Sequence, residues 1–213
     1  CPEVKDAVSF RFEFNNYRKN VDLSKIRLYS GARKNSWESE AGLTLRAFER
    51  TADDVIQSKD SYITRNAVID VTEHMTADGR LQWTAPDEGD WTILRIGHVN
   101  KGKRNAPAPP EGTGWECDKL SVKGAEAHFP GYVGRLADGA LKGGLLDGML
   151  LDSWECNTQT WTQDMEMEFD QRCGYELRQW LPALFGYVMD DPQTTSRYLL
   201  DWRGTVGNLI TER

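Results

Sequence analysis

Hydrophobic and polar residues alternate through the first half of the chain. Between Ala7 and about Val99 the runs VSFRFEF, KIRLYS, LTLRAFER, AVIDV, RLQWTAP and WTILRIGHV are separated by polar connections that carry Asn, Asp or Gly. Alternation with a period of two predicts short strands with one buried face. An Asp78–Gly79 turn before one strand and residues 87–90 before the next predict a hairpin. We therefore expect residues 1–98 to form an antiparallel, β-sandwich-like segment.

The pattern changes after Asn100. The segment NAPAPPEGTG, residues 105–114, predicts an irregular and stiff loop, because proline donates no backbone hydrogen bond. Residues 118–139 have helical character, and Leu120 and Leu136 are plausible core positions. The apolar run 144–151 then predicts a parallel strand buried on both faces. Three helical stretches follow, so residues 99–213 are expected to form an α/β unit.

Composition narrows the class of protein. The chain has 213 residues, of which 39% are hydrophobic and 28% charged, so it can bury a core. No run approaches the ~18 apolar residues of a membrane span, so we expect none. A net charge of -7 argues against binding of nucleic acid. Four cysteines without a C-x-x-C pair and three scattered histidines argue against structural zinc and leave a disulfide between Cys117 and Cys156 open.

Candidate chemistry lies where predicted strands end. In parallel α/β architectures, ligands meet the carboxyl ends of the strands. Asp152 and Glu155 follow the run 144–151, and His98 ends another predicted strand, which continues to the loop that carries Glu116. Two carboxyl groups on one such face can hydrolyse a glycosidic bond, one as proton donor and one on the anomeric side.

Aromatic and amide side chains accompany these acids, as expected for a site that binds sugar. Each has a plainer interpretation, because a tryptophan is more often part of the core, Glu116 can be a solvated carboxylate, and Asp118 can cap a helix that begins near Lys119. The candidate substrate-binding residues are His98, Asn105, Trp115, Asp118, Lys119, Asp152, Trp154 and Asn157.

Several segments, in order, resemble glycoside hydrolase family 106, the α-L-rhamnosidases of bacteria that degrade plant polysaccharides. They are WTILRIGHVNKGKRNAPAPPEGTGWECDKLS, LLDSWECNTQTWT, MEFDQRCGYELRQWLPALFGYV and YLLDWRGTVGNLITE, and the resemblance covers residues 91–213. Residues 1–90 are similar only in their general β-rich character, like the insertion that these enzymes carry beside the barrel. The resemblance implies a (β/α)₈ (TIM) barrel with β-sandwich elements, inverting hydrolysis of terminal α-L-rhamnosides, a bound calcium ion, and a periplasmic or extracellular location.

The same resemblance assigns roles to single residues. Glu116 in ECDKLS looks like one of the two catalytic carboxylates and is assigned as the general base. Glu155 is the other candidate catalytic residue, and with Asp152 it looks like a contact for the sugar or the ion. Residues 99–213 suffice for only the first part of a barrel of ~250 residues, so a further carboxylate is expected beyond Arg213.

The chain begins CPEV without a signal peptide and is expected to be a piece of a longer protein. Three alternatives for its function stay open. It can be part of a rhamnosidase, a carbohydrate-binding fragment without activity, or part of a hydrolase for another sugar, because specificity resides in loops rather than in the fold. The metal ligands and the oligomeric state are not fixed by these patterns.

Overall fold

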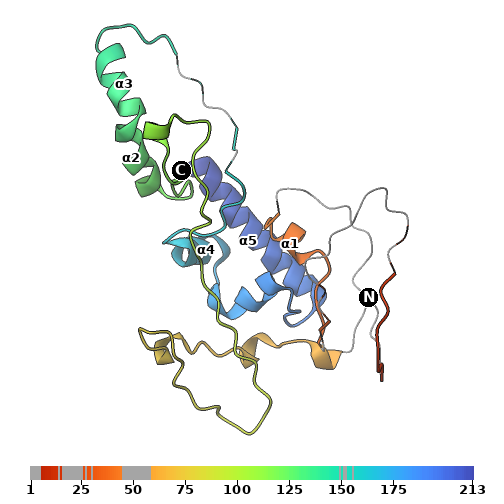
Figure 1. Cartoon of the computed structure of the whole chain (residues 1–213). Helices are drawn as coiled ribbons and strands as arrows, with labels where there is room; N and C mark the ends of the chain where they lie inside the picture. The colour runs from red at the N-terminus through yellow and green to blue at the C-terminus, as the bar shows by residue number, and fades with distance from the viewer. Residues whose placement is uncertain are drawn as a thin grey trace.

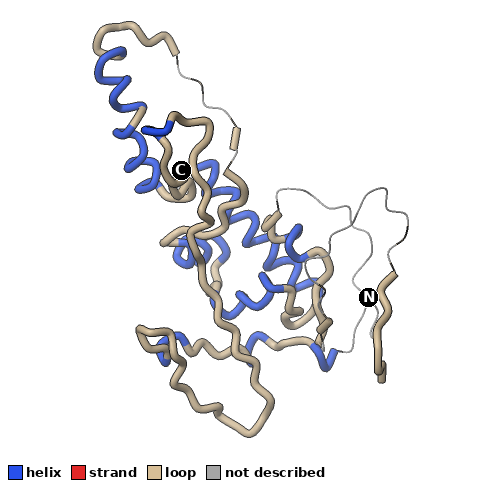
Figure 2. Tube along the Cα trace, viewed as in Figure 1, coloured by secondary structure: helices blue, strands red, loops and turns tan. Residues whose placement is uncertain are grey.

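The computed structural model describes residues 6–13, 15, 26, 28–29, 31–44, 59–148, 150, 153–154 and 156–213. The α-helices are α1 (Trp37–Glu40), α2 (Val122–His128), α3 (Val133–Ala140), α4 (Met165–Cys173) and α5 (Pro192–Glu212). The 3₁₀ helices are η1 (Lys59–Ser61), η2 (Arg65–Ala67), η3 (Thr72–His74), η4 (Pro110–Gly112), η5 (Phe129–Gly131) and η6 (Arg178–Phe185). Within these ranges no strand forms (Figure 2), and extended segments meet only at isolated bridges.

The predicted fold class, a β-sandwich-like segment followed by part of a (β/α)₈ barrel, is wrong for the described residues. The expected Asp78–Gly79 turn is present, because the Thr76 amide donates to the Arg80 carbonyl at 2.8 Å. Pairing stops one step further, at the Met75–Leu81 bridge. Residues 91–99 are extended without a ladder, and Ile93 is 62% exposed. Alternation indicates which side chains could share a face, but a strand also needs a partner, and the described chain supplies none here.

The apolar run 144–151 is likewise not a buried strand. Leu145 is 79% exposed and Leu150 is 87% exposed, and the described part of the run pairs with no other described segment. A short apolar run does not identify its own environment, because a buried strand and an exposed connection can share a composition. Asp152 and Glu155, which follow this run, lie outside the described residues.

The helices of the second half are confirmed, because their signals are local. α4 ends at Gly174, whose φ of 76° is left-handed and suits a residue without a Cβ. α5 begins with Asp191, whose side chain accepts a hydrogen bond from the Thr194 amide at 2.8 Å, and Pro192 occupies its first turn. In the first helical region α2 and α3 form as expected and Leu120 is buried, whereas Leu136 is exposed.

The core lies between α4, η6 and α5 (Figure 1). α5 buries one face along its length, as an amphipathic helix does. Tyr198 packs against Phe169 of α4 and stacks on Trp180 of η6, with ring centroids 5.8 and 5.6 Å apart. Burial of each such aromatic side chain contributes roughly 1.5–3 kcal/mol, so these contacts fix the relative positions of the three helices.

Two earlier segments are hydrogen-bonded to this core. The Lys34 amide donates to the Gly186 carbonyl at 2.8 Å. The Ile63 amide donates to the Val188 carbonyl at 2.9 Å, and the Ile63 carbonyl accepts from the Asp190 amide at 2.8 Å. Residues 31–44 and 59–71 therefore pack on the surface formed by η6 and the start of α5.

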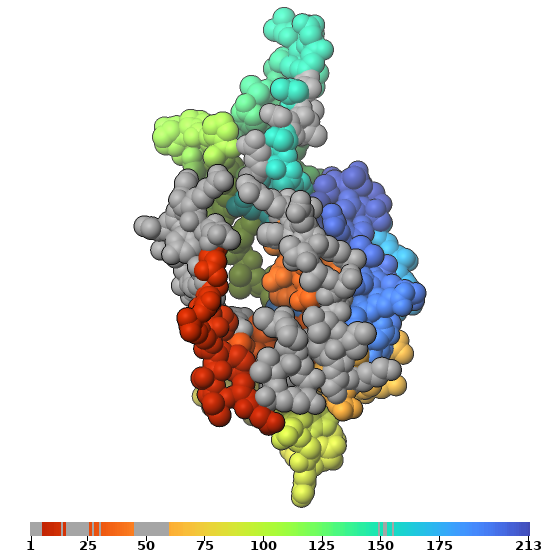
Figure 3. Space-filling view, turned by 90° about the vertical axis from the view of Figure 1, so that its right-hand side faces the viewer, coloured from red at the N-terminus to blue at the C-terminus, as the bar shows by residue number. Residues whose placement is uncertain are grey.

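Two parts of the molecule extend away from the core (Figures 1 and 3). Helices α2 and α3 project at one end, and neither contains a buried residue. The loop of residues 76–98 projects at the opposite end. No helix among the described residues is long and apolar enough to cross a membrane.

Candidate active site

Two backbone hydrogen bonds close the proline-rich loop and position Glu116 at its end. The Glu116 amide donates to the Lys103 carbonyl at 3.1 Å, and the Asn105 amide donates to the Gly114 carbonyl at 3.1 Å. The Asn105 side chain then closes the proline-rich loop: its Nδ2 donates to the Gly112 carbonyl at 3.0 Å, and its Oδ1 accepts from the Gly114 amide at 2.6 Å. Both ends of this side-chain amide are thus used to hold the loop.

Glu116 is paired with a cation. The Lys119 ammonium donates to Glu116 Oε2, and only 15% of the Glu116 side chain is exposed. Burial lowers the pKa of Lys119, but the hydrogen bond to Glu116 and the attraction of Glu116, Cys156 and Cys117 together outweigh burial, so the pKa is raised above its ordinary value. The ammonium also lies 5.9 Å from the centroid of the Trp154 ring. A carboxylate, an ammonium and an indole face are therefore neighbours.

The Trp154 ring is fixed by a tight turn. Its Nε1 donates to the Asn157 carbonyl at 2.7 Å, and Asn157 has a left-handed φ of 63°. Asparagine tolerates this conformation better than most residues do. The Lys101 ammonium donates to the carbonyl of the buried Cys156, which ties the same turn to the start of the proline-rich loop.

Asp118 holds the backbone rather than capping α2. Its Oδ1 accepts from the Leu120 amide at 2.9 Å, and its Oδ2 accepts from the Thr162 hydroxyl at 2.7 Å. The residue at the N-cap of α2 is Ser121. Since both oxygens of Asp118 have partners, this carboxylate serves to anchor the segment that follows Glu116.

The Gln159 side chain holds the same segment from outside it. Gln159 Nε2 donates to the Cys117 carbonyl at 2.9 Å, and Gln159 Oε1 accepts from the Lys119 amide at 2.9 Å. The two bonds fix the backbone on either side of Asp118, directly after Glu116.

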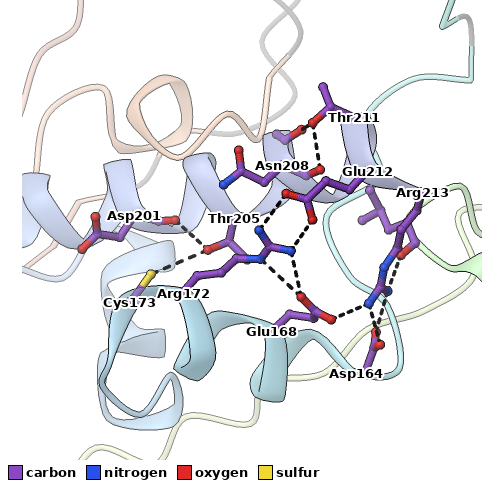
Figure 4. A network of polar contacts seen from close by, with 12 residues as sticks. Asp164, Glu168, Arg172, Cys173, Asp201, Thr205, Asn208, Thr211, Glu212 and Arg213 are labelled. Atoms are coloured by element: carbon purple, nitrogen blue, oxygen red, sulfur yellow. Dashed lines mark hydrogen bonds and ion pairs between the residues drawn. The ribbon is translucent and has the colours of Figure 1, made fainter.

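A network of charged side chains links α4 to the end of α5 (Figure 4). Arg213, after the end of α5, donates to Asp164 at 3.0 and 2.9 Å, to Glu168 of α4 at 2.5 Å, and to the Leu120 carbonyl at 2.7 Å. Arg172 donates to the same Glu168 at 3.2 and 3.0 Å. α4, the end of α5 and the Glu116 segment are thereby joined.

Gly124 allows α2 to approach this segment closely. A Cβ built on Gly124 would lie 2.2 Å from the Asp118 carbonyl oxygen, a backbone atom with little freedom to move. A glycine is therefore needed at this position if the segment is to keep its place.

The remaining predicted site residues lie at the edges of the site formed by Glu116, Lys119 and Trp154. Trp115 is 60% exposed, forms a bridge with Arg104, and has the Arg104 guanidinium 4.7 Å from its ring centroid. His98 is exposed and stacks on Trp161, with centroids 5.7 Å apart. Trp161 in turn stacks on Trp202 of the core at 6.1 Å.

The structure thus brings part of the predicted site together. Glu116, Lys119 and Trp154 meet, with Asp118 and Asn157 as supports. Asn105 and Trp115 adjoin them along the loop, and His98 is placed by its stacking on Trp161. Gln159 is one of the amide side chains that accompany the acids in the sequence, but it was given no role in the site. Thr162 was not predicted, although it ends the same polar run, NTQTWT.

The described residues do not form a calcium site. No three of their His, Cys, Asp or Glu side chains are grouped so as to hold a metal ion. Asp118 uses both oxygens on protein donors, and Glu116 is paired with Lys119. Calcium binding stays a prediction, and no step of the reaction below involves the ion.

Comparisons with known proteins complete the picture. The family model described as alpha-L-rhamnosidase, glycoside hydrolase family 106, matches residues 5–213. A "Putative beta-glucuronidase" of Formosa agariphila is 36% identical over 162 residues, which are 75% of this chain and 14% of that protein.

A solved structure, the rhamnosidase from Novosphingobium sp. PP1Y, is similar with a TM-score of 0.65 and 27% identity. The similarity covers 87% of this chain and 18% of that one, so the chain spans less than a fifth of the length of either relative. With a family match over nearly its whole length, the chain belongs to glycoside hydrolase family 106, the alpha-L-rhamnosidase family.

Proposed function

We propose that this chain is the part of a longer glycoside hydrolase that supplies the general base for inverting hydrolysis of terminal α-L-rhamnosides. One observation carries the proposal: a half-buried glutamate, Glu116, pairs with Lys119 beside the Trp154 ring in a chain that belongs to this family. A carboxylate held this way is fixed in direction, as a group that must meet a single water molecule has to be.

In the proposed step, Glu116 takes a proton from water while the water oxygen bonds to the anomeric carbon. The bond to Lys119 uses Oε2, which leaves Oε1 to accept the proton. The glycosidic carbon–oxygen bond breaks as the water attacks, and a carboxylic acid elsewhere in the full-length protein protonates the leaving oxygen. Inverting enzymes keep the two carboxyl groups about 6.5–9.5 Å apart, so that the water fits between them.

The neighbouring side chains suit a sugar ring. The Trp154 indole beside the ion pair offers an apolar face, and the exposed Trp115 offers a second one along the loop. Rhamnose carries a methyl group and several C–H bonds, which pack on such faces, while charged side chains bind its hydroxyl groups.

The test uses the full-length protein and an aryl α-L-rhamnoside. We expect release of rhamnose, and proton NMR in the first minutes should find the β anomer, because inversion of an α-glycoside gives the β product. Appearance of the α anomer first would contradict the inverting mechanism. Absence of any rhamnose release would contradict the proposal that the substrate is an α-L-rhamnoside.

A second candidate substrate is a β-glucuronide, because of the name of the Formosa relative. Glucuronic acid carries a carboxylate, which needs a cation in the site. Lys119 is already paired with Glu116 and Lys101 with a carbonyl, although the Arg104 guanidinium lies over the Trp115 ring. The family model that matches residues 5–213 is that of the alpha-L-rhamnosidases, whose sugar carries no carboxylate. We therefore favour the neutral sugar. Faster hydrolysis of an aryl β-glucuronide than of the rhamnoside in the same assay would reverse this choice.

A further inference from the structure

The side chain of Gln159 forms two hydrogen bonds with the backbone of the segment that carries Glu116. It lies in the irregular segment 156–164 and faces residues 40 and 42 positions earlier. Its Oε1 and Nε2 form one donor and one acceptor interaction, both 2.9 Å long, with Lys119 and Cys117. A primary amide that pairs in this way presents the same pattern as a peptide edge, and it restrains position and direction together.

These two bonds act on the ion pair rather than on the core. Cys117 directly follows Glu116, and Lys119 is the other member of the pair, so the clamp fixes the backbone next to both charged side chains. Gln159 itself is half-buried, unlike the buried Thr162 that bonds Asp118. The clamp therefore lies at the site, while Thr162 anchors the segment more deeply.

The clamp also joins the segment that carries Glu116 to the stretch of chain that carries Trp154. The Trp154 ring is tied to that stretch by its bond to the Asn157 carbonyl. The bond between the Lys119 amide and Gln159 therefore holds the backbone of Lys119, whose ammonium lies 5.9 Å from the Trp154 centroid, beside this stretch. If the bonds were lost, the two segments could shift relative to each other without unfolding.

We propose that Gln159 is a positioning residue for hydrolysis, which orients the Glu116–Lys119 pair toward the sugar bound at Trp154. This inference rests on the proposed function of Glu116. A displacement of the base by as little as about 1 Å can cost on the order of a hundredfold in rate, so the effect of Gln159 falls on turnover more than on stability.

The test compares Gln159→Met with Gln163→Met in the full-length protein. Methionine has nearly the length of glutamine but makes neither bond, and Gln163 is an exposed residue of the same segment. For Gln159→Met we expect kcat to fall at least tenfold and KM to change less than threefold, because the base is displaced while the sugar still binds. Gln163→Met should match the wild type.

A second variant covers the case in which Gln159→Met fails to fold. Gln159→Glu keeps the acceptor for the Lys119 amide but places a carboxylate oxygen against the Cys117 carbonyl, so kcat should fall in this variant as well. An unchanged kcat in a folded Gln159 variant would overturn the proposal. So would a loss of activity that only follows a lower melting temperature. An inactive wild type would instead contradict the proposed function.

Discussion

At the scale of single residues, space and hydrogen-bond partners decide what each side chain contributes. Gly124 is tolerated against the Asp118 carbonyl because it has no Cβ, and the carboxylate of Asp118 is fully used on protein donors. Tyr198 shows the opposite case, since its hydroxyl is buried without a hydrogen-bond partner among the described residues.

Gly124→Ala should therefore push α2 away from the segment that carries Glu116. With a Cβ 2.2 Å from the Asp118 oxygen, we expect the free energy of unfolding to fall by about 1–3 kcal/mol, the usual cost of forcing extra atoms into a packed site. Gly139→Ala in α3 is the control, because its Cβ would meet nothing within 4 Å. Urea unfolding measures both. Equal effects of the two substitutions would contradict the close approach.

Tyr198→Phe should leave stability unchanged or raise it by up to about 1 kcal/mol, because a buried hydroxyl without a partner is removed. Tyr175→Phe is the matched control. Its hydroxyl donates to Asp201 at 2.8 Å, so its loss should destabilise the protein. Thermal unfolding of both variants checks the contrast, and a large loss in Tyr198→Phe would reveal a hydrogen-bond partner that the core provides.

At the scale of elements, charged pairs tie α4 to the end of α5. The pKa of Asp164 is lowered from its ordinary value of 3.8, chiefly by the hydrogen bond from Arg213. A carboxyl group with a lowered pKa in the folded state stabilises the fold above pH 3.8, and this stabilisation is lost as the pH falls below that value. The joint between the two helices should consequently weaken in acid.

Asp164→Asn isolates this effect. We expect it to lower the urea midpoint at pH 7 and to make the difference from the wild type shrink as the pH falls toward 2–3, because protonation then disables the wild-type carboxylate as well. Asp138→Asn removes an exposed pair with Lys142 and should change little at any pH. A difference from the wild type that stays constant with pH would show that the pair does not act through charge.

An element could be predicted from the sequence when the residues that cause it lie within it or next to it. α4 and α5 carry their own end signals, Gly174 and Asp191–Pro192, together with an apolar face, and they were predicted. Strands were predicted wrongly because alternation does not supply a partner. In the site, Glu116 and Trp154 were identified by motif. The polar run that contains Gln159 is visible in the sequence, but its bonds to residues 40 and 42 positions earlier depend on the fold and could not be predicted.

At the scale of the whole molecule, the projecting helices α2 and α3 leave apolar side chains in water. Phe129, Tyr132, Leu136 and Leu141 are all exposed on this arm. Exposed apolar surface of this kind promotes association. The 213-residue chain on its own should therefore self-associate.

Leu136→Lys with Leu141→Lys should reduce that association, because charges replace the apolar surface. Arg135→Ala, also on α3, serves as a control that alters charge without removing apolar surface. Sedimentation velocity across a range of concentrations measures the effect. A wild-type chain that sediments as a monomer and melts cooperatively would contradict this prediction.

The account of the molecule depends most on Glu116 as the base, and Glu116→Gln in the full-length protein tests it directly. The change keeps the shape of the side chain and removes its basicity, so we expect kcat on an aryl α-L-rhamnoside to fall by about 10²–10⁴-fold. The protein should stay folded, with a modest fall in melting temperature because Lys119 loses its charged partner. Glu111→Gln, an exposed glutamate of the proline-rich loop, should retain full activity. Undiminished turnover in a correctly folded Glu116→Gln enzyme would contradict the assignment.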